Sequence, residues 1–217
     1  MTTKTTAVAE TEEVVPALNL QRIQRAEVLV PIIGTAPLIV HKWSEKARRQ
    51  MLENAQGKKR VKTPKNPQQE YEDSLYRLED GRNGFPAVAF KAAIANAARY
   101  FGKEVSITLL KQALFVRGVG PDQLVPLIGE PKLREDTARV GQGGTENRFR
   151  GEFREWSAML TIVYIPSMLS IDSLVSLVDA AGLGGVGEWR PSAPKSSTGM
   201  YGTFTVREDM EIVEVKP

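Results

Sequence analysis

The densest group of residues able to bind a ligand lies between Lys42 and Lys65. This segment has nine lysine or arginine residues against two acids, Glu45 and Glu53, so it carries +7 in a chain whose total is +3. Lysine and arginine contact nucleic-acid phosphates and release counterions. The segment is therefore predicted to follow a nucleic-acid backbone through Lys42, Arg48, Arg49, Lys58, Lys59, Arg60, Lys62 and Lys65. The alternative is a solvated surface run without a ligand.

A second basic cluster surrounds the glycine-rich stretch Gly141–Thr145. It combines one aromatic ring with four arginines, a composition suited to base stacking and backbone contacts on a hairpin. The residues predicted to bind there are Arg139, Arg148, Phe149, Arg150 and Arg154. The alternative is that the last two arginines only pair with Glu152 and Glu155 across a sheet surface.

A glycine-rich loop is expected from Gly182 to Gly202. It lacks the Gly-Lys-Ser/Thr ending of a P-loop. It also follows a helix and precedes a strand, the reverse of the order that binds a dinucleotide pyrophosphate. Within this loop, Trp189, Arg190 and Lys195 are predicted to stack on or contact a nucleic-acid strand. The alternative for Trp189 is a packing anchor.

His41 and Trp43 follow the first predicted strand, where a sheet would meet its helix. His41 is the only histidine of the chain. We interpret it as a hydrogen-bonded structural or ligand-contacting group, not as a catalyst, and both residues join the predicted nucleic-acid-binding set.

Catalytic and metal chemistry find little support in the residues. The chain has no cysteine and one histidine, which excludes a disulfide framework, a thiolate nucleophile and zinc-thiolate or multi-histidine sites. The adjacent acids Glu72–Asp73, Glu135–Asp136 and Glu208–Asp209 point in different directions on a strand or helix. We therefore expect no enzyme, no metal and no cofactor; a metal-dependent nuclease using scattered acids is the weakest alternative.

Strands and helices follow each other in an order that predicts an α+β fold. Alternating or β-branched apolar runs predict strands, and capping residues before periodic apolar residues predict helices. The predicted strands are 26–33, 114–117, 124–128, 132–140, 149–164 and 201–206. The predicted helices are 44–55, 68–78, 88–100 and 171–182. This order fits a ferredoxin-like (RRM-like) βαββαβ core that carries an inserted basic loop with helices and a further hairpin.

One folded domain is expected at residues 21–217, after a disordered tail at 1–20. Its insertions are expected at about 42–80 and 118–150. The first fifteen residues lack the apolar region of a signal sequence, and no window approaches the roughly 20 apolar residues of a membrane span. We expect a cytoplasmic protein without a membrane partner.

Two segments carry a family resemblance. In residues 84–99, Pro86, Lys91 and Arg99 precede or lie on an alanine-rich helix, and in residues 182–202 the glycines are Gly184, Gly185, Gly187, Gly199 and Gly202. The first segment resembles the entry to the first conserved helix of the RAMP superfamily, the ferredoxin-like backbone subunits of CRISPR effector complexes, although Ala92 stands where a glycine is usual. The second is similar to that family's C-terminal glycine-rich loop. The resemblance implies RNA binding by assembling subunits with basic residues and a thumb-like hairpin, and it adds Lys91 and Arg99 to the predicted site.

Together these features predict a non-catalytic protein that binds single-stranded nucleic acid and multimerises along the strand. The expected ligand is single-stranded DNA in phage replication or recombination, because the compact size and acidic C-terminal tail suit a phage-encoded relative. One alternative is an RNA-binding backbone subunit of a CRISPR-type effector complex, and another is a phage structural or inhibitory protein that mimics such a subunit. The expected partners are single-stranded DNA or RNA, further copies of the chain in a homo-oligomer or helical filament, and CRISPR or replication proteins.

Overall fold

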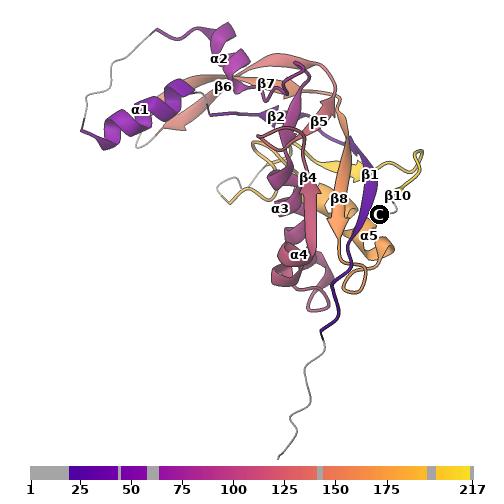
Figure 1. Ribbon diagram of the computed structural model, residues 1–217. Coiled ribbons are helices and arrows are strands. Elements are labelled where there is room, and N and C mark those ends of the chain that lie inside the picture. Colours follow the sequence, from indigo (N-terminus) through magenta and orange to yellow (C-terminus); the bar gives the residue numbers. More distant parts are fainter. Residues whose placement is uncertain (1–19, 44, 58–63, 141–143, 195–198, 216–217) are drawn as a thin grey trace, which may run out of the picture.

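The computed structural model describes residues 20–43, 45–57, 64–140, 144–194 and 199–215. The predicted tail at 1–20 lies outside these residues except for Leu20. Figure 1 shows a body of sheet and helices from which a helix and a hairpin project on the same side. The strands are β1 (Ala26–Gly34), β2 (Leu38–Val40), β3 (Gly84–Pro86), β4 (Leu114–Arg117), β5 (Leu124–Ile128), β6 (Pro131–Val140), β7 (Gly144–Phe153), β8 (Ser157–Tyr164), β9 (Phe204–Val206) and β10 (Val213–Val215). The helices are α1 (Glu45–Ala55), α2 (Pro67–Ser74), α3 (Ala87–Ala97), the 3-10 turn η1 (Ala98–Phe101), α4 (Ile107–Ala113) and α5 (Ile171–Gly184).

The central sheet has the strand order and connections of a ferredoxin-like core. β1 pairs antiparallel with β8, β4 pairs with the other edge of β8, and β9 pairs with the other edge of β1. Helix α3 lies between β1 and β4 in the chain, and α5 lies between β8 and β9. The order β9, β1, β8, β4 is that of a βαββαβ sheet, so the predicted fold class is confirmed. β3, β5 and β10 extend the same sheet.

The core lies between this sheet and the helix pair α3 and α5. In β1, alternate residues Val28, Val30 and Ile32 are fully buried. Phe90 of α3 and Leu174 of α5 belong to the same apolar cluster. Each such side chain stabilises the fold by about 1.5–3 kcal/mol when it leaves water. Because alternate strand residues share one face, this burial also determines which face of β1 packs against the helices, and thereby the register in which β1 pairs with its neighbours.

The prediction of a single strand over 149–164 is wrong. The chain bends at residues 154–156 and forms β7 in a second sheet and β8 in the central sheet. At the corner Trp156 is 3% exposed, and its indole N–H donates to the Ala36 carbonyl at 2.9 Å. Its own carbonyl accepts from the Gly34 N–H at 2.8 Å. The buried indole anchors the corner, where the adjacent residues Arg154 and Glu155 are both exposed and the alternation of buried side chains is interrupted.

β2, β7 and β6 form the second sheet, whose outer part is the projecting hairpin. β6 and β7 pair over ten residues, from Pro131 opposite Phe153 to Val140 opposite Gly144. Helix α2 packs on one face of β7, and the backbone N–H of Gly151 donates to the α2 hydroxyl of Ser74 at 2.9 Å. The hairpin is inserted between β5 and β8, and the segment from β2 to β3 is inserted between β1 and α3.

Several element boundaries differ from the prediction. The helix predicted at 68–78 ends at Ser74, because Leu75 is extended with φ −83° and ψ 143°. Helix α5 continues to Gly184, so the first residues of the expected glycine-rich loop are helical. Helix α4 and strand β10 were not predicted. In the part of the chain that the structure describes, no helix combines the length and apolar character needed to cross a bilayer.

Substitution of Gly182 by alanine should destabilise the protein, because a Cβ there would lie 1.7 Å from the Phe204 carbonyl oxygen of β9. Forced overpacking of this kind costs about 1–3 kcal/mol. Gly184→Ala is the matched control in the same helix, since its Cβ would meet nothing closer than 3.4 Å. Its stability should stay within about 1 kcal/mol of wild type. Urea unfolding followed by circular dichroism measures both, and equal stabilities would contradict the close contact of α5 with β9.

Candidate nucleic-acid interface

A pocket of about 250 Å³ opens where β2 leaves the second sheet and α1 begins. Val40, the last residue of β2, is buried, and the Lys42 N–H donates to the Ser74 carbonyl at 2.9 Å. The strand end and α2 thereby position the residues that follow β2. The pocket is lined by Lys42, Trp43, Arg48, Tyr76, Pro86, Asp122 and Leu124. Three predicted residues therefore meet at one site, together with a tyrosine that was not predicted.

The two aromatic rings of this cationic pocket, formed by the seven residues above, differ in exposure. Tyr76 packs edge-on against Phe85, with ring centroids 5.7 Å apart, and the Lys42 ammonium lies 6.0 Å from the Tyr76 centroid. Burial, followed by the negative charge of Glu188, raises the pKa of the Tyr76 phenol, which is therefore neutral at pH 7 and able to donate a hydrogen bond. Trp43 is 52% exposed. The pocket thus has one fixed ring and one indole that is open to a ligand.

This combination suits an unstacked base and its neighbouring phosphates. A base that stacks on an aromatic side chain gains about 1–3 kcal/mol, whatever its identity. Lys42 and Arg48 supply positive charge next to the rings, and Asp122 adds a hydrogen-bond acceptor. A site built from these groups would bind a single strand and discriminate weakly between bases.

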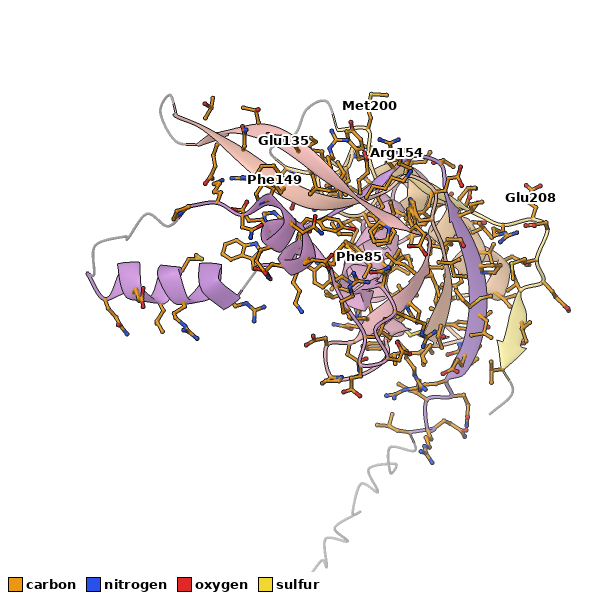
Figure 2. All side chains as sticks on the ribbon, turned by 90° about the horizontal axis from the view of Figure 1, so that it is seen from above. Phe85, Glu135, Phe149, Arg154, Met200 and Glu208 are labelled. Atoms are coloured by element: carbon orange, nitrogen blue, oxygen red, sulfur yellow. The ribbon has the colours of Figure 1, made fainter. Side chains whose placement is uncertain are left out.

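The other predicted residues of the basic segment lie in different places. Arg48 and Arg49 are exposed on α1, which projects from the body in both Figure 1 and Figure 2. Lys65 lies against the hairpin, where its ammonium pairs with Glu146 at 3.0 Å and donates to the Asn147 carbonyl. Outside the described residues are Lys58, Lys59, Arg60 and Lys62.

The hairpin arginines meet acids at the hairpin base instead of lining an open surface. Arg150 is 1% exposed and lies 3.8 Å from Asp136 and 3.9 Å from Glu188. Arg134, its register partner on β6, donates to Asp136 at 2.8 Å and to Glu152 at 2.6 Å. Burial lowers the pKa of Arg150; burial would also lower that of Arg134, but hydrogen bonds with Glu152, Asp136 and Tyr201 raise it. Arg150 is therefore buried beside these acids in this arrangement.

The other residues predicted on the hairpin have different environments. Arg154 is exposed and pairs with Glu152 at 3.3 Å, in keeping with the ion-pair alternative. Arg148 and Phe149 are partly exposed on β7. The side chain of Arg139 and the turn at 141–143 lie outside the described residues. Arg148 approaches Glu146 at 4.0 Å, so each described arginine of this cluster has an acid beside it. Phe149 is the partly exposed aromatic ring of the cluster.

The glycine-rich loop packs against the hairpin base. The Trp189 ring lies 5.5 Å from the Arg134 guanidinium and 5.3 Å from that of Arg150. The Tyr201 hydroxyl accepts from Arg134 at 3.2 Å, and Arg190 donates to the Gly187 carbonyl at 2.9 Å. Trp189 is thus engaged as a packing anchor, the alternative drawn from the sequence. Lys195 lies outside the described residues.

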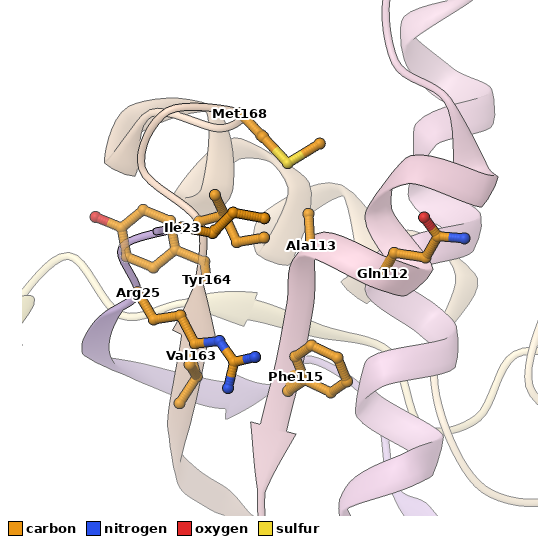
Figure 3. Close-up of a pocket in the computed structure, with 9 residues that line it drawn as sticks. Ile23, Arg25, Gln112, Ala113, Phe115, Val163, Tyr164 and Met168 are labelled. Carbon is orange, nitrogen blue, oxygen red and sulfur yellow. The ribbon is translucent and has the colours of Figure 1, made fainter. Parts of the chain in front are cut away.

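Lys91 and Arg99 are not among the residues that line the cationic pocket. The Lys91 ammonium lies 3.9 Å from the centroid of Phe115, on β4, and Arg99 is exposed on η1. Phe115 also lines a second pocket of about 310 Å³ with Ile23, Arg25 and Met168 (Figure 3). Of the residues that carry the family resemblance in 84–99, Pro86 thus lines the cationic pocket, and Lys91 and Arg99 do not.

Sequence reasoning missed Tyr76, Arg134, Asp136 and Tyr201. The sequence indicates that two of them lie together, because Arg134 and Asp136 are two residues apart on a predicted strand and so share a face. Their meeting with Arg150 depends on the hairpin register, which the sequence did not supply. Tyr76 follows α2 and reaches the pocket only through the packing of α2 on β7.

His41 lies beside the loop acid Glu188, with 4.0 Å between imidazole Nδ1 and carboxylate. Burial, followed by the positive charge of Arg150, lowers the pKa of His41, so the imidazole is neutral at pH 7. Within the described residues, no three histidine, aspartate or glutamate side chains gather to hold a metal ion. Glu135 and Glu208, from two of the acid pairs singled out in the sequence, lie on different sides of the molecule in Figure 2.

Acidification should destabilise the fold through His41. Its folded pKa is below its ordinary value, so the unfolded chain binds the proton more readily and the free energy of unfolding should fall as the pH drops below about 6.5. His41→Gln does not titrate and should lose less stability over that range. Urea unfolding of both proteins between about pH 7.5 and 5.5 isolates the contribution of His41 to the pH dependence of stability, because both proteins contain the same carboxylates. Parallel pH profiles would contradict the lowered pKa.

Comparison with known proteins finds similar solved structures at low sequence identity. No protein-family model matches the sequence, and no curated protein does. A chain of the type III-B Cmr-beta complex bound to cognate target RNA is 12% identical with a TM-score of 0.42, and the match covers 88% of this chain and 61% of that one. Cmr6 from Pyrococcus furiosus is 11% identical with a TM-score of 0.42, covering 86% of this chain and 100% of the other. This chain thus spans less than two thirds of the first neighbour's length.

Proposed function

We propose that this chain is a non-catalytic subunit that binds single-stranded RNA within a CRISPR-type ribonucleoprotein complex. The observation that supports the proposal is the cationic pocket, in which exposed Trp43 lies beside fixed Tyr76 between Lys42 and Arg48. A base would stack on Trp43, and the flanking phosphates would contact the two cations. The sequence from 58 to 63, with four of its six residues basic, continues the same basic segment.

The choice of RNA and of a protein assembly rests on the resemblance of residues 84–99 and 182–202 to RAMP proteins. The first segment forms β3 and α3, the first helix of the ferredoxin-like core, and the second leads into its last strand. The hairpin of β6 and β7 lies between the second and third core strands. The expectation of single-stranded DNA in a phage process had only the compact size and the acidic C-terminal tail behind it, and DNA is therefore an outcome of the test instead of a second proposal.

Trp43→Ala should weaken binding of a labelled single-stranded RNA about 5- to 150-fold, because one stacked base contributes about 1–3 kcal/mol. Tyr100→Ala is the matched control, since Tyr100 is an aromatic residue with 59% exposure at the far end of α3 and η1. Fluorescence anisotropy with single-stranded RNA, single-stranded DNA and duplex DNA measures each affinity. Equal loss in both variants would contradict stacking at the pocket, and tighter binding of DNA would reassign the polymer.

Lys42→Ala and Arg48→Ala should each lower the salt dependence of binding. A phosphate contact to a single strand contributes about 0.7 to the slope of log K against log salt, so each variant should lose about that amount. Lys103→Ala removes an exposed cation beyond η1 and should leave the slope unchanged. A slope that falls equally in all three variants would indicate general charge attraction without a defined site.

A further inference from the structure

Two arginines and a histidine lie under the glycine-rich loop, next to the cationic pocket but separate from it. β7 carries Arg148 and Arg150 two residues apart, so both side chains lie on one face of the hairpin. His41 follows β2 and is close enough to both arginines for their charges to act on it. The loop places the carboxylate of Glu188 over this group, 3.9 Å from Arg150 and 4.0 Å from His41.

Arg150 is unusual because two nitrogens of its guanidinium, which is 1% exposed, lack acceptors among the described residues. Among the described residues, neither its Nε nor its Nη1 has a hydrogen-bond partner. The acids Asp136 and Glu188 are at ion-pair distance from Nη1, 3.8 and 3.9 Å, which is too long for a hydrogen bond. A buried charged donor without an acceptor is costly, so this group would gain from a ligand with several acceptor oxygens.

The two acids beside Arg150 differ in how firmly they are held. The Asp136 side chain is 5% exposed and accepts from Arg134 at 2.8 Å. The Glu188 side chain is 40% exposed. Its backbone N–H donates to the Ile39 carbonyl at 3.0 Å, so the loop stays anchored when the side chain rotates. A rotation of Glu188 alone would expose the cations without unfolding the loop.

We propose that the Glu188 carboxylate occupies the position of a nucleic-acid phosphate, and that a phosphate of the bound strand displaces it to contact His41, Arg148 and Arg150. Arginine binds phosphate through paired hydrogen bonds, which a carboxylate at 3.9 Å does not form here. His41 directly precedes Lys42 of the cationic pocket, so neighbouring nucleotides reach both sites. The inference rests on the proposed function and assigns it a second phosphate contact.

Glu188→Gln tests the competition, because the amide keeps the size of the side chain and removes its charge. Binding of a labelled single-stranded RNA should become about two- to fivefold tighter, the range expected for loss of a partly exposed ion pair. Glu155→Gln is the control, since it removes one exposed acid at the bend between β7 and β8. Equal affinities of the two variants would overturn the inference while leaving the proposed function intact.

A direct readout comes from the Arg150 side chain. In Glu188→Gln, the NMR signal of the Arg150 Nε–H group should shift when a short single-stranded oligonucleotide is added, and the shift should be smaller at equal ligand concentration in wild type. An unchanged Arg150 signal at saturation would also overturn the inference. Absence of binding by wild type to any single strand would instead overturn the proposed function, and the inference with it.

Discussion

Two buried or half-buried guanidiniums lie at the base of the hairpin, and the surrounding structure has to compensate their positive charges. Arg134 and Arg150 face each other across β6 and β7, and their charges are compensated by Asp136, Glu152 and the loop acid Glu188. Removing one partner of such a buried pair is strongly destabilising, whereas forming it yields little net stability. The network therefore acts mainly as a specific junction, at which the hairpin, the end of β2 and the glycine-rich loop have one compatible arrangement.

This junction separates cations that hold the fold from cations that are available to a ligand. The total of +3 gives no indication of that division, because Arg134 and Arg154 are paired with acids while Lys42 and Arg48 line an open pocket. The same division explains why the aromatic residues differ in role. Trp189 is packed on guanidiniums, and Trp43 presents its ring to solvent. Site geometry, more than net charge, thus supports binding of a single strand.

The sequence predicted the ferredoxin-like core because its signals are local: apolar alternation in β1, an alanine-rich helix after Pro86 and a capped helix before the last strand. It also brought Lys42, Trp43 and Arg48 into one predicted set, since all three lie within seven residues. It failed where distant segments decide the outcome. The corner at Trp156 depends on contacts with Gly34 and Ala36, and the burial of Arg150 depends on hairpin register and a loop some forty residues later. Neither set of contacts produces a periodic pattern of residues in the sequence.

The proposed function depends on the contact of a single-strand base with Trp43 in the pocket beside Tyr76. Photo-crosslinking tests this contact most directly, with single-stranded RNA that carries 5-bromouridine at each position in turn and with mass spectrometry to identify the linked residue. We expect crosslinks in the peptide that contains Trp43 or in the one that contains Tyr76, and their loss in excess unlabelled RNA. Specific crosslinks confined to Phe115, Tyr100 or Trp189 would contradict it and place the strand on another face of the molecule.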